Sequence, residues 1–153
     1  SGGKLLKTPE SAPTDNQVRF RIDFDFERQD LIGQLSLETS GALDISVVDP
    51  RVVRVMDLKT PGSGEVERNR YGNLDLLAET DQVKFVISSR EDYDWARQML
   101  QQYDIAKRCT VLFSPVHGRQ DATELADWIL QDRLPVRLQI QLHKYLWGNE
   151  PGR

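Results

Sequence analysis

Hydrophobic residues alternate strictly with charged ones over residues 18–26, VRFRIDFDF. Apolar side chains occupy every second position, and arginine or aspartate occupies each position between them. A period of two is typical of a β-strand that has one buried face and one solvated face. The pattern therefore predicts a half-exposed strand over residues 18–26, either antiparallel to its neighbour or at the edge of a sheet.

From residue 35 onward, short apolar runs alternate with stretches of helical periodicity. The runs, each predicted to be a strand, are 35–39, 53–58, 83–87, 110–113 and 136–142. Two amphipathic helices are predicted, over 91–103 with Ser89 as the N-cap and over 121–133. A weaker helix is predicted over 65–79, where Gly72 interrupts the pattern. Alternating strands and helices predict a parallel sheet with right-handed crossovers. The predicted fold class is α/β, as a partial (β/α) barrel or an open, doubly wound parallel sheet, with an added N-terminal edge strand.

Composition divides the chain into three parts and excludes several function classes. Residues 1–17 are rich in Ser, Thr, Pro and Gly and predict a flexible lead; residues 18–34 form a strand segment of unknown origin, and 35–153 form the α/β domain. The net charge of −4 argues against general nucleic-acid or acidic-membrane binding. No run approaches the roughly 18 apolar residues of a membrane helix, and no signal peptide is visible. With a single cysteine, these features predict a cytoplasmic protein.

Polar and glycine residues follow most of the predicted strands. They are Glu38, Thr39, Ser40 and Gly41, then Lys59 and Gly62, then Ser114, Pro115, His117 and Gly118, and finally His143. In a parallel α/β fold these strand ends share one rim, which is where polar ligands bind. Ordinary loops have the same composition, so both readings stay open. Lys59 and Lys84 are the better candidates for a site, because a lysine on an apolar strand requires a partner or an anion.

Three further residues have structural and functional interpretations. His143 is predicted on the polar face near a strand end, where a histidine is either a hydrogen-bonding structural residue or a catalyst. His117 is interpreted as a loop residue, and Cys109 as an inert core thiol. The string KTPGSGE lacks the GK[ST] ending of a phosphate loop, so its glycines favour a sharp turn or a close backbone approach.

Several uncommon strings occur together in one order. They are LETSGALDISVVDPRVVRVMDLKTPGSGEVERNRYGNLDLL, DQVKFVI, LFSPVHG and RLQIQLHKYLWG. On these residues the chain, over about 35–153, resembles the carboxyl-terminal part of 7-carboxy-7-deazaguanine synthase, a radical S-adenosylmethionine family. The resemblance implies a partial (β/α) barrel and a homodimer. It implies a lyase of queuosine and 7-deazapurine biosynthesis that converts the pterin substrate 6-carboxy-5,6,7,8-tetrahydropterin by radical ring contraction.

The same resemblance implies cofactors and binding residues. The cofactors are S-adenosylmethionine, a [4Fe–4S] cluster and Mg2+. The residues implied along the S-adenosylmethionine cleft are Glu38, Thr39, Ser40, Lys59, Ser114 and Pro115. His143 is implied to face the pterin, and Arg153 belongs to a tail implied near the substrate pocket.

One feature departs from the family. In the synthase family, a loop with three cysteines holds the [4Fe–4S] cluster, whereas this chain has the single cysteine Cys109. We therefore expect the chain to be inactive by itself, with its front part lost, replaced, or supplied by a partner chain. The alternative is a non-catalytic α/β scaffold or interaction module that self-associates through the strand 18–26.

Overall fold

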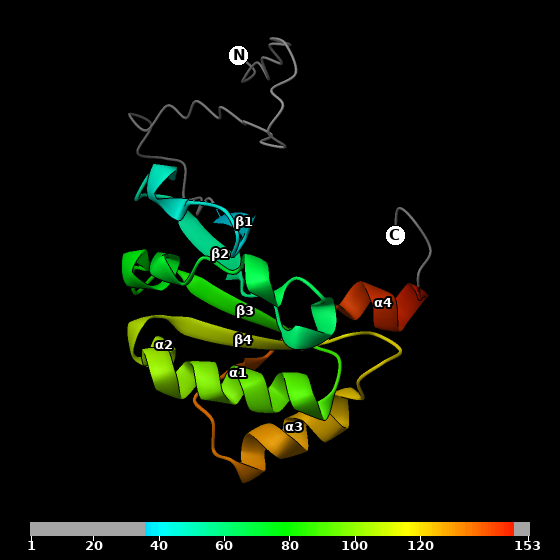
Figure 1. Cartoon of the computed structure of the whole chain (residues 1–153). Coiled ribbons are helices and arrows are strands. Elements are labelled where there is room, and N and C mark those ends of the chain that lie inside the picture. Colours follow the sequence, from blue (N-terminus) through cyan, green and yellow to red (C-terminus); the bar gives the residue numbers. More distant parts are fainter. Residues whose placement is uncertain (1–35, 149–153) are drawn as a thin grey trace, which may run out of the picture. The chain divides into compact units, whose positions relative to one another are not determined.

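The computed structural model describes residues 36–148, without the side chains of His143, Tyr145 and Trp147 (Figure 1). The predicted lead over 1–17, the predicted strand over 18–26 and Arg153 lie outside the described residues. These expectations stay predictions, and so do the domain boundaries that depend on them.

The described residues form a five-stranded sheet in which every neighbouring pair is parallel. Its strands are β1 (Ser36–Ser40), β2 (Val53–Asp57), β3 (Gln82–Ile87), β4 (Thr110–Pro115) and β5 (Arg137–Leu138). The α/β class and the parallel sheet are thus confirmed. The strands lie in chain order, β1-β2-β3-β4-β5, without the reversal that defines a doubly wound sheet. This order is that of a barrel wall, and the sheet is not closed.

The two main predicted helices are present. The helices are α1 (Arg90–Tyr103), α2 (Ile105–Arg108), α3 (Ala122–Gln131) and α4 (Leu142–Trp147). The Ser89 side chain accepts a hydrogen bond from the N–H of Asp92, so the predicted N-cap of α1 is confirmed. Asp121 caps α3 in the same way, accepting from the N–H groups of Thr123 and Glu124. Both helices therefore begin at side chains that satisfy first-turn donors.

The predicted weak helix over 65–79 was wrong. This segment forms the short 3-10 helices η3 (Val66–Arg68) and η4 (Tyr71–Leu76), preceded by η2 (Pro61–Ser63). Asn69 and Asn73 direct their side-chain amides to backbone groups of other segments. These side-chain bonds compete with the backbone hydrogen bonds of a continuous α-helix, and Gly72 has a low helix propensity.

The predicted strand over 136–142 was too long. Only Arg137–Leu138 is strand, paired with Leu112 and Phe113 of β4. One more bond follows, from the N–H of Gln139 to the carbonyl of Phe113 at 2.8 Å, and α4 begins at Leu142. His143 therefore lies in a helix and does not follow a strand end. Among the described strands, β5 has β4 as its one neighbour, and an edge strand has few ladder bonds to prolong it.

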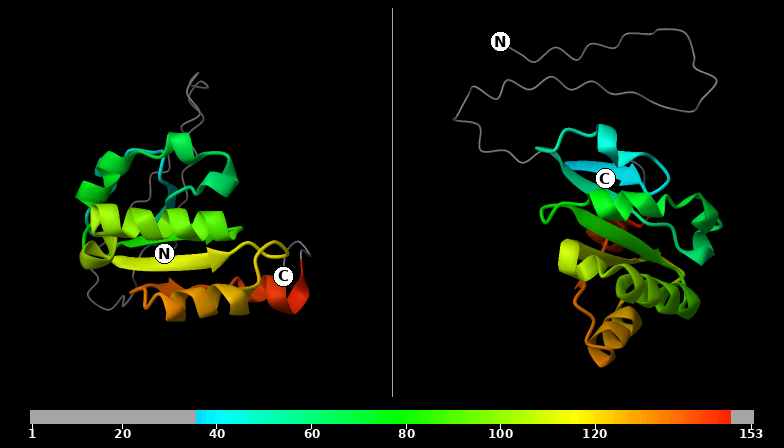
Figure 2. Two further views of the ribbon diagram at one scale, coloured as in Figure 1. Left: turned by 60° about the horizontal axis from the view of Figure 1, so that its bottom comes forward. Right: turned by 60° about the vertical axis from the view of Figure 1, so that its left-hand side comes forward.

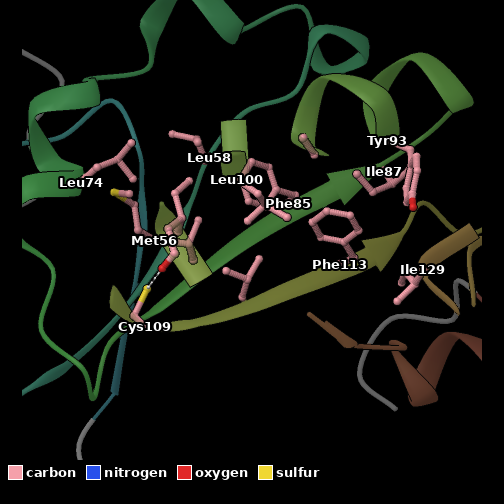
Figure 3. Close-up of a cluster of buried hydrophobic side chains, with 14 of the residues drawn as sticks. Met56, Leu58, Leu74, Phe85, Ile87, Tyr93, Leu100, Cys109, Phe113 and Ile129 are labelled. Atoms are coloured by element: carbon pink, nitrogen blue, oxygen red, sulfur yellow. Dashed lines mark hydrogen bonds between the residues drawn. The ribbon is translucent and has the colours of Figure 1, made fainter. Parts of the chain in front are cut away.

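The hydrophobic core lies between the sheet and the helices. Figures 1 and 2 show α1 and α3 on the same face of the sheet, as right-handed crossovers between sequential strands require. Fully buried side chains of this face include Met56, Phe85, Ile87 and Phe113, which are labelled in Figure 3. Val83 and Val111 are buried on the same face. The rings of Phe85 and Phe113 meet edge to face at 5.5 Å. No helix of the described residues is long and apolar enough to cross a membrane.

Candidate functional site

A row of polar side chains crosses the sheet on the face that α1 and α3 do not cover. The strand register aligns Ser40, Asp57, Lys84, Leu112 and Arg137, one from each strand. Register partners in a parallel sheet point to the same side, so these five share one face. Both faces of a buried parallel sheet are normally apolar. A row with four polar members therefore marks this face as the candidate site.

Asp57 and Lys59 form an ion pair at the carboxyl end of β2. The Lys59 ammonium donates to Asp57 Oδ2 at 2.6 Å, and the two side chains are 31% and 27% exposed. Asp57 Oδ1 is buried and makes no hydrogen bond with the described residues. A buried carboxylate oxygen without a donor costs free energy, so the carboxyl end of β2 holds an acceptor that the described residues leave unsatisfied.

Asn69 fixes the backbone that carries Lys59. Its side-chain oxygen accepts from the N–H of Lys59 at 2.9 Å, and its side-chain nitrogen donates to the carbonyl of Lys59 at 2.8 Å. Asn73 donates in turn to the carbonyls of Gly41 and Leu43. Two amides from the η segments therefore hold the loops that follow β1 and β2.

Gly41 is required by a close backbone approach. Its N–H donates to the carbonyl of Asp57 at 2.9 Å, and a Cβ placed on it would lie 2.9 Å from that same oxygen. A side chain at this position would displace β1 from the end of β2. The glycine of LETSG thus brings the polar end of β1 against Asp57.

The glycine-rich string after Lys59 is a structural turn. The buried carboxylate of Asp92 accepts from the N–H of Gly62 at 2.7 Å and from the N–H and hydroxyl of Ser88. A Cβ on Gly62 would clash with Asp92. The predicted close backbone approach is confirmed, because the loop lies directly against the start of α1.

A second feature at the same rim is a cleft at the carboxyl end of β4. It has a volume of about 360 Å³ and lies between the β4–α3 loop and the segment before α4. Its lining includes Pro115, His117, Arg119 and Gln141. Pro115 is the last residue of β4, so this cleft belongs to the strand-end rim.

The structure brings some predicted residues together and separates others. Glu38, Ser40, Lys59 and Ser114 gather on the rim or on the helix-free face, with Ser114 buried on β4. Strand alternation places Thr39 on the opposite face, where its hydroxyl donates to the carbonyl of Ser40.

No family model matches the chain. The chain is 44% identical over 115 residues to the 7-carboxy-7-deazaguanine synthase of Chlorobaculum tepidum, which covers 73% of this chain and 52% of that protein. It is 40% identical to that of Koribacter versatilis, covering 56% of that protein, and 35% identical to that of Leptospira interrogans, covering 50%. The chain resembles the 7-carboxy-7-deazaguanine synthases. The predicted resemblance is confirmed, and the chain spans about half the length of these curated relatives.

The implied iron–sulfur cluster does not fit the residues of this chain. Cys109 is the single cysteine, and it precedes the amino end of β4, opposite the polar rim. Burial raises the pKa of its thiol to about 11, which disfavours the thiolate that binds iron (Figure 3). No group of three His, Cys, Asp or Glu side chains within residues 36–148 is placed to hold a metal ion.

Sequence reasoning missed Asn69, Asn73 and Asp92 as residues of this rim, and it noted Asp57 at the end of the second predicted strand without giving it a role. Asp57 carried a signal, since it is a carboxylate ending an apolar strand. The asparagines carried none, because their partners lie 10 to 32 positions away in the sequence. Asp92 carried none either, because its partner Gly62 lies 30 positions away in the sequence.

Proposed function

We propose that this chain forms the carboxyl-terminal part of a 7-carboxy-7-deazaguanine synthase and contributes binding surface for S-adenosylmethionine and the pterin substrate. The observation that carries the proposal is the polar row Ser40–Asp57–Lys84 on the open face, within a chain that is 44% identical to such a synthase. Because its single cysteine does not fit the cluster, we propose that the chain is inactive by itself.

The predicted residues take separate roles in this proposal. Glu38, Ser40 and Lys59 line the S-adenosylmethionine cleft, and Thr39 supports it from the other face. Ser114 and Pro115 border the adenosine. His143 and Arg153 stay predicted contacts of the pterin. S-adenosylmethionine supplies the radical source of the reaction when bound, and Mg2+ is implied as a further cofactor.

Lys59 has the geometry for a polar contact. Its backbone is held by two hydrogen bonds from Asn69, and its ammonium is held by Asp57. A side chain fixed at both ends loses little rotamer entropy on binding. This preorganisation suits a ligand group that approaches the rim.

Three expectations remain predictions. The homodimer is predicted from the resemblance, and the cytoplasmic location is predicted from the composition. The alternative scaffold role depends on residues 18–26, which lie outside the described residues. Light scattering before and after deletion of residues 1–30 tests that alternative, which requires a dimer that the deletion dissociates.

Calorimetric titration tests the proposed function. The wild-type chain is expected to bind S-adenosylmethionine or 6-carboxy-5,6,7,8-tetrahydropterin. Lys59→Met is expected to weaken that binding about ten- to hundredfold, the range for losing a charged hydrogen bond. Lys107→Met is the matched control, since Lys107 is 77% exposed on α2 at the other end of the sheet. Absence of binding to both compounds would overturn the proposal.

A further inference from the structure

Lys84 occupies an unusual position for a cation. It lies in β3, the middle strand of the described sheet, and points to the face opposite Val83 and Phe85. Its side chain is partly buried, and it makes no hydrogen bond or ion pair with residues 36–148. Middle strands of parallel sheets normally carry Val, Ile or Leu on both faces. An unpaired ammonium group there requires a compensating anion.

The neighbours of Lys84 do not supply that anion. Its register partners are Asp57 on β2 and Leu112 on β4. Asp57 directs Oδ2 to Lys59 at 2.6 Å, so this carboxylate already has a cation. Two lysines and one aspartate leave the central cluster with a charge of +1.

Charges at the edges of the same face balance one another. Glu38 lies on β1, in register with Val55, and Arg137 lies on β5, in register with Leu112. One negative and one positive charge cancel, so the described strand residues of this face, together with Lys59, keep the +1 of the central cluster. The charge balance therefore matches a singly charged anion better than a doubly charged phosphate.

We propose that Lys84 binds the carboxylate of a small-molecule ligand on the face that it shares with Asp57. Lys59 holds Asp57 in place through Oδ2. This inference rests on the proposed function and names a ligand-binding residue for it. Both S-adenosylmethionine and 6-carboxy-5,6,7,8-tetrahydropterin carry a carboxylate that Lys84 can bind. The carboxypterin is a single anion and matches the charge of the face, whereas S-adenosylmethionine also carries ammonium and sulfonium charges and is a cation overall.

The test compares each ligand with its counterpart that lacks the carboxylate. Calorimetry on the full chain measures binding of S-adenosylmethionine and decarboxylated S-adenosylmethionine, and of the carboxypterin and the same tetrahydropterin without the carboxyl group. Lys84→Met is expected to weaken binding of one carboxylate ligand about ten- to hundredfold. The same substitution is expected to leave the affinity for the matching decarboxylated compound unchanged. Lys84→Arg restores part of the affinity, because the charge returns in a different shape.

Controls separate the inference from folding and from the proposed function. Lys107→Met removes an exposed lysine and is expected to change no affinity, and urea unfolding verifies that Lys84→Met is folded. If Lys84→Met lowers affinity equally for the carboxylate and decarboxylated forms, or for neither, the inference is overturned while the proposed function stands. If the wild-type chain binds none of the four compounds, the proposed function fails and the inference fails with it.

Discussion

The two ends of strand β2 each carry an ion pair, and the two pairs are built differently. At the amino end, Arg54 and Asp81 are 9% and 2% exposed. The Asp81 carboxylate accepts from the Arg54 side chain, from the N–H of Arg54 at 2.8 Å and from the N–H of Ala78 at 2.7 Å. At the carboxyl end, Lys59 and Asp57 are 31% and 27% exposed, and one carboxylate oxygen of Asp57 has no donor among the described residues.

The difference indicates what each end does. The buried Arg54–Asp81 pair has its hydrogen bonds satisfied and fixes the start of β2 to the turn before β3. It leaves no unpaired polar atom that a ligand could contact. A partly exposed pair contributes little to stability, and its exposed side-chain atoms remain accessible to a ligand. The contrast agrees with parallel α/β folds in general, where the amino ends of strands serve stability and the carboxyl ends serve function.

The largest expected effect is at the amino end. Asp81→Ala leaves the Arg54 guanidinium buried without its carboxylate, and the free energy of unfolding is expected to fall by about 3–5 kcal/mol. Urea unfolding measures the change. Asp75→Ala is the control, because it removes the exposed pair with Arg108 and is expected to cost about 0–1 kcal/mol. Equal losses in the two variants would contradict the structural role of Asp81.

A smaller effect is expected from acid. Burial alone would raise the pKa of Asp81, but hydrogen bonds from Arg54 and Ala78 outweigh it and hold the pKa below its ordinary value of 3.8. A lowered folded-state pKa gives stability that is present above the unfolded pKa and lost as the pH falls through the folded pKa. The stability difference between wild type and Asp81→Ala should therefore be constant above about pH 5 and shrink below about pH 4. Denaturant midpoints across this range measure it, and a difference independent of pH would refute the assignment.

The smallest effect on stability is expected at the carboxyl end. Asp57→Asn keeps the shape of the side chain and removes a half-exposed ion pair, so the free energy of unfolding should change by at most about 1 kcal/mol. Urea unfolding again provides the measurement, with Asp81→Asn as the matched variant of the buried pair. A loss at Asp57 as large as the loss at Asp81 would show that both ends of β2 serve stability.

Local patterns identified most of the regular structure. Four of the five predicted strands lie within a few residues of their observed positions, because runs such as residues 83–87 alternate between a core face and an open face. The helix α1 was predicted together with its Ser89 cap, since capping and amphipathic spacing are both short-range signals. The weak helix over 65–79 and the long final strand failed where long-range bonds or an edge position decided the outcome.

The sequence by itself determined that residues 36–148 form a parallel α/β unit and that polar residues end its strands. It also identified the resemblance to the synthases, because uncommon strings survive in order along the chain. The tertiary structure alone decided which polar residues act together. Asp57 and Lys84 are 27 positions apart and meet through strand register, and Asn69 reaches Lys59 only after the η segments fold back. Pairings of this kind depend on how strands align and which atoms remain without a partner, and neither property is written in local sequence.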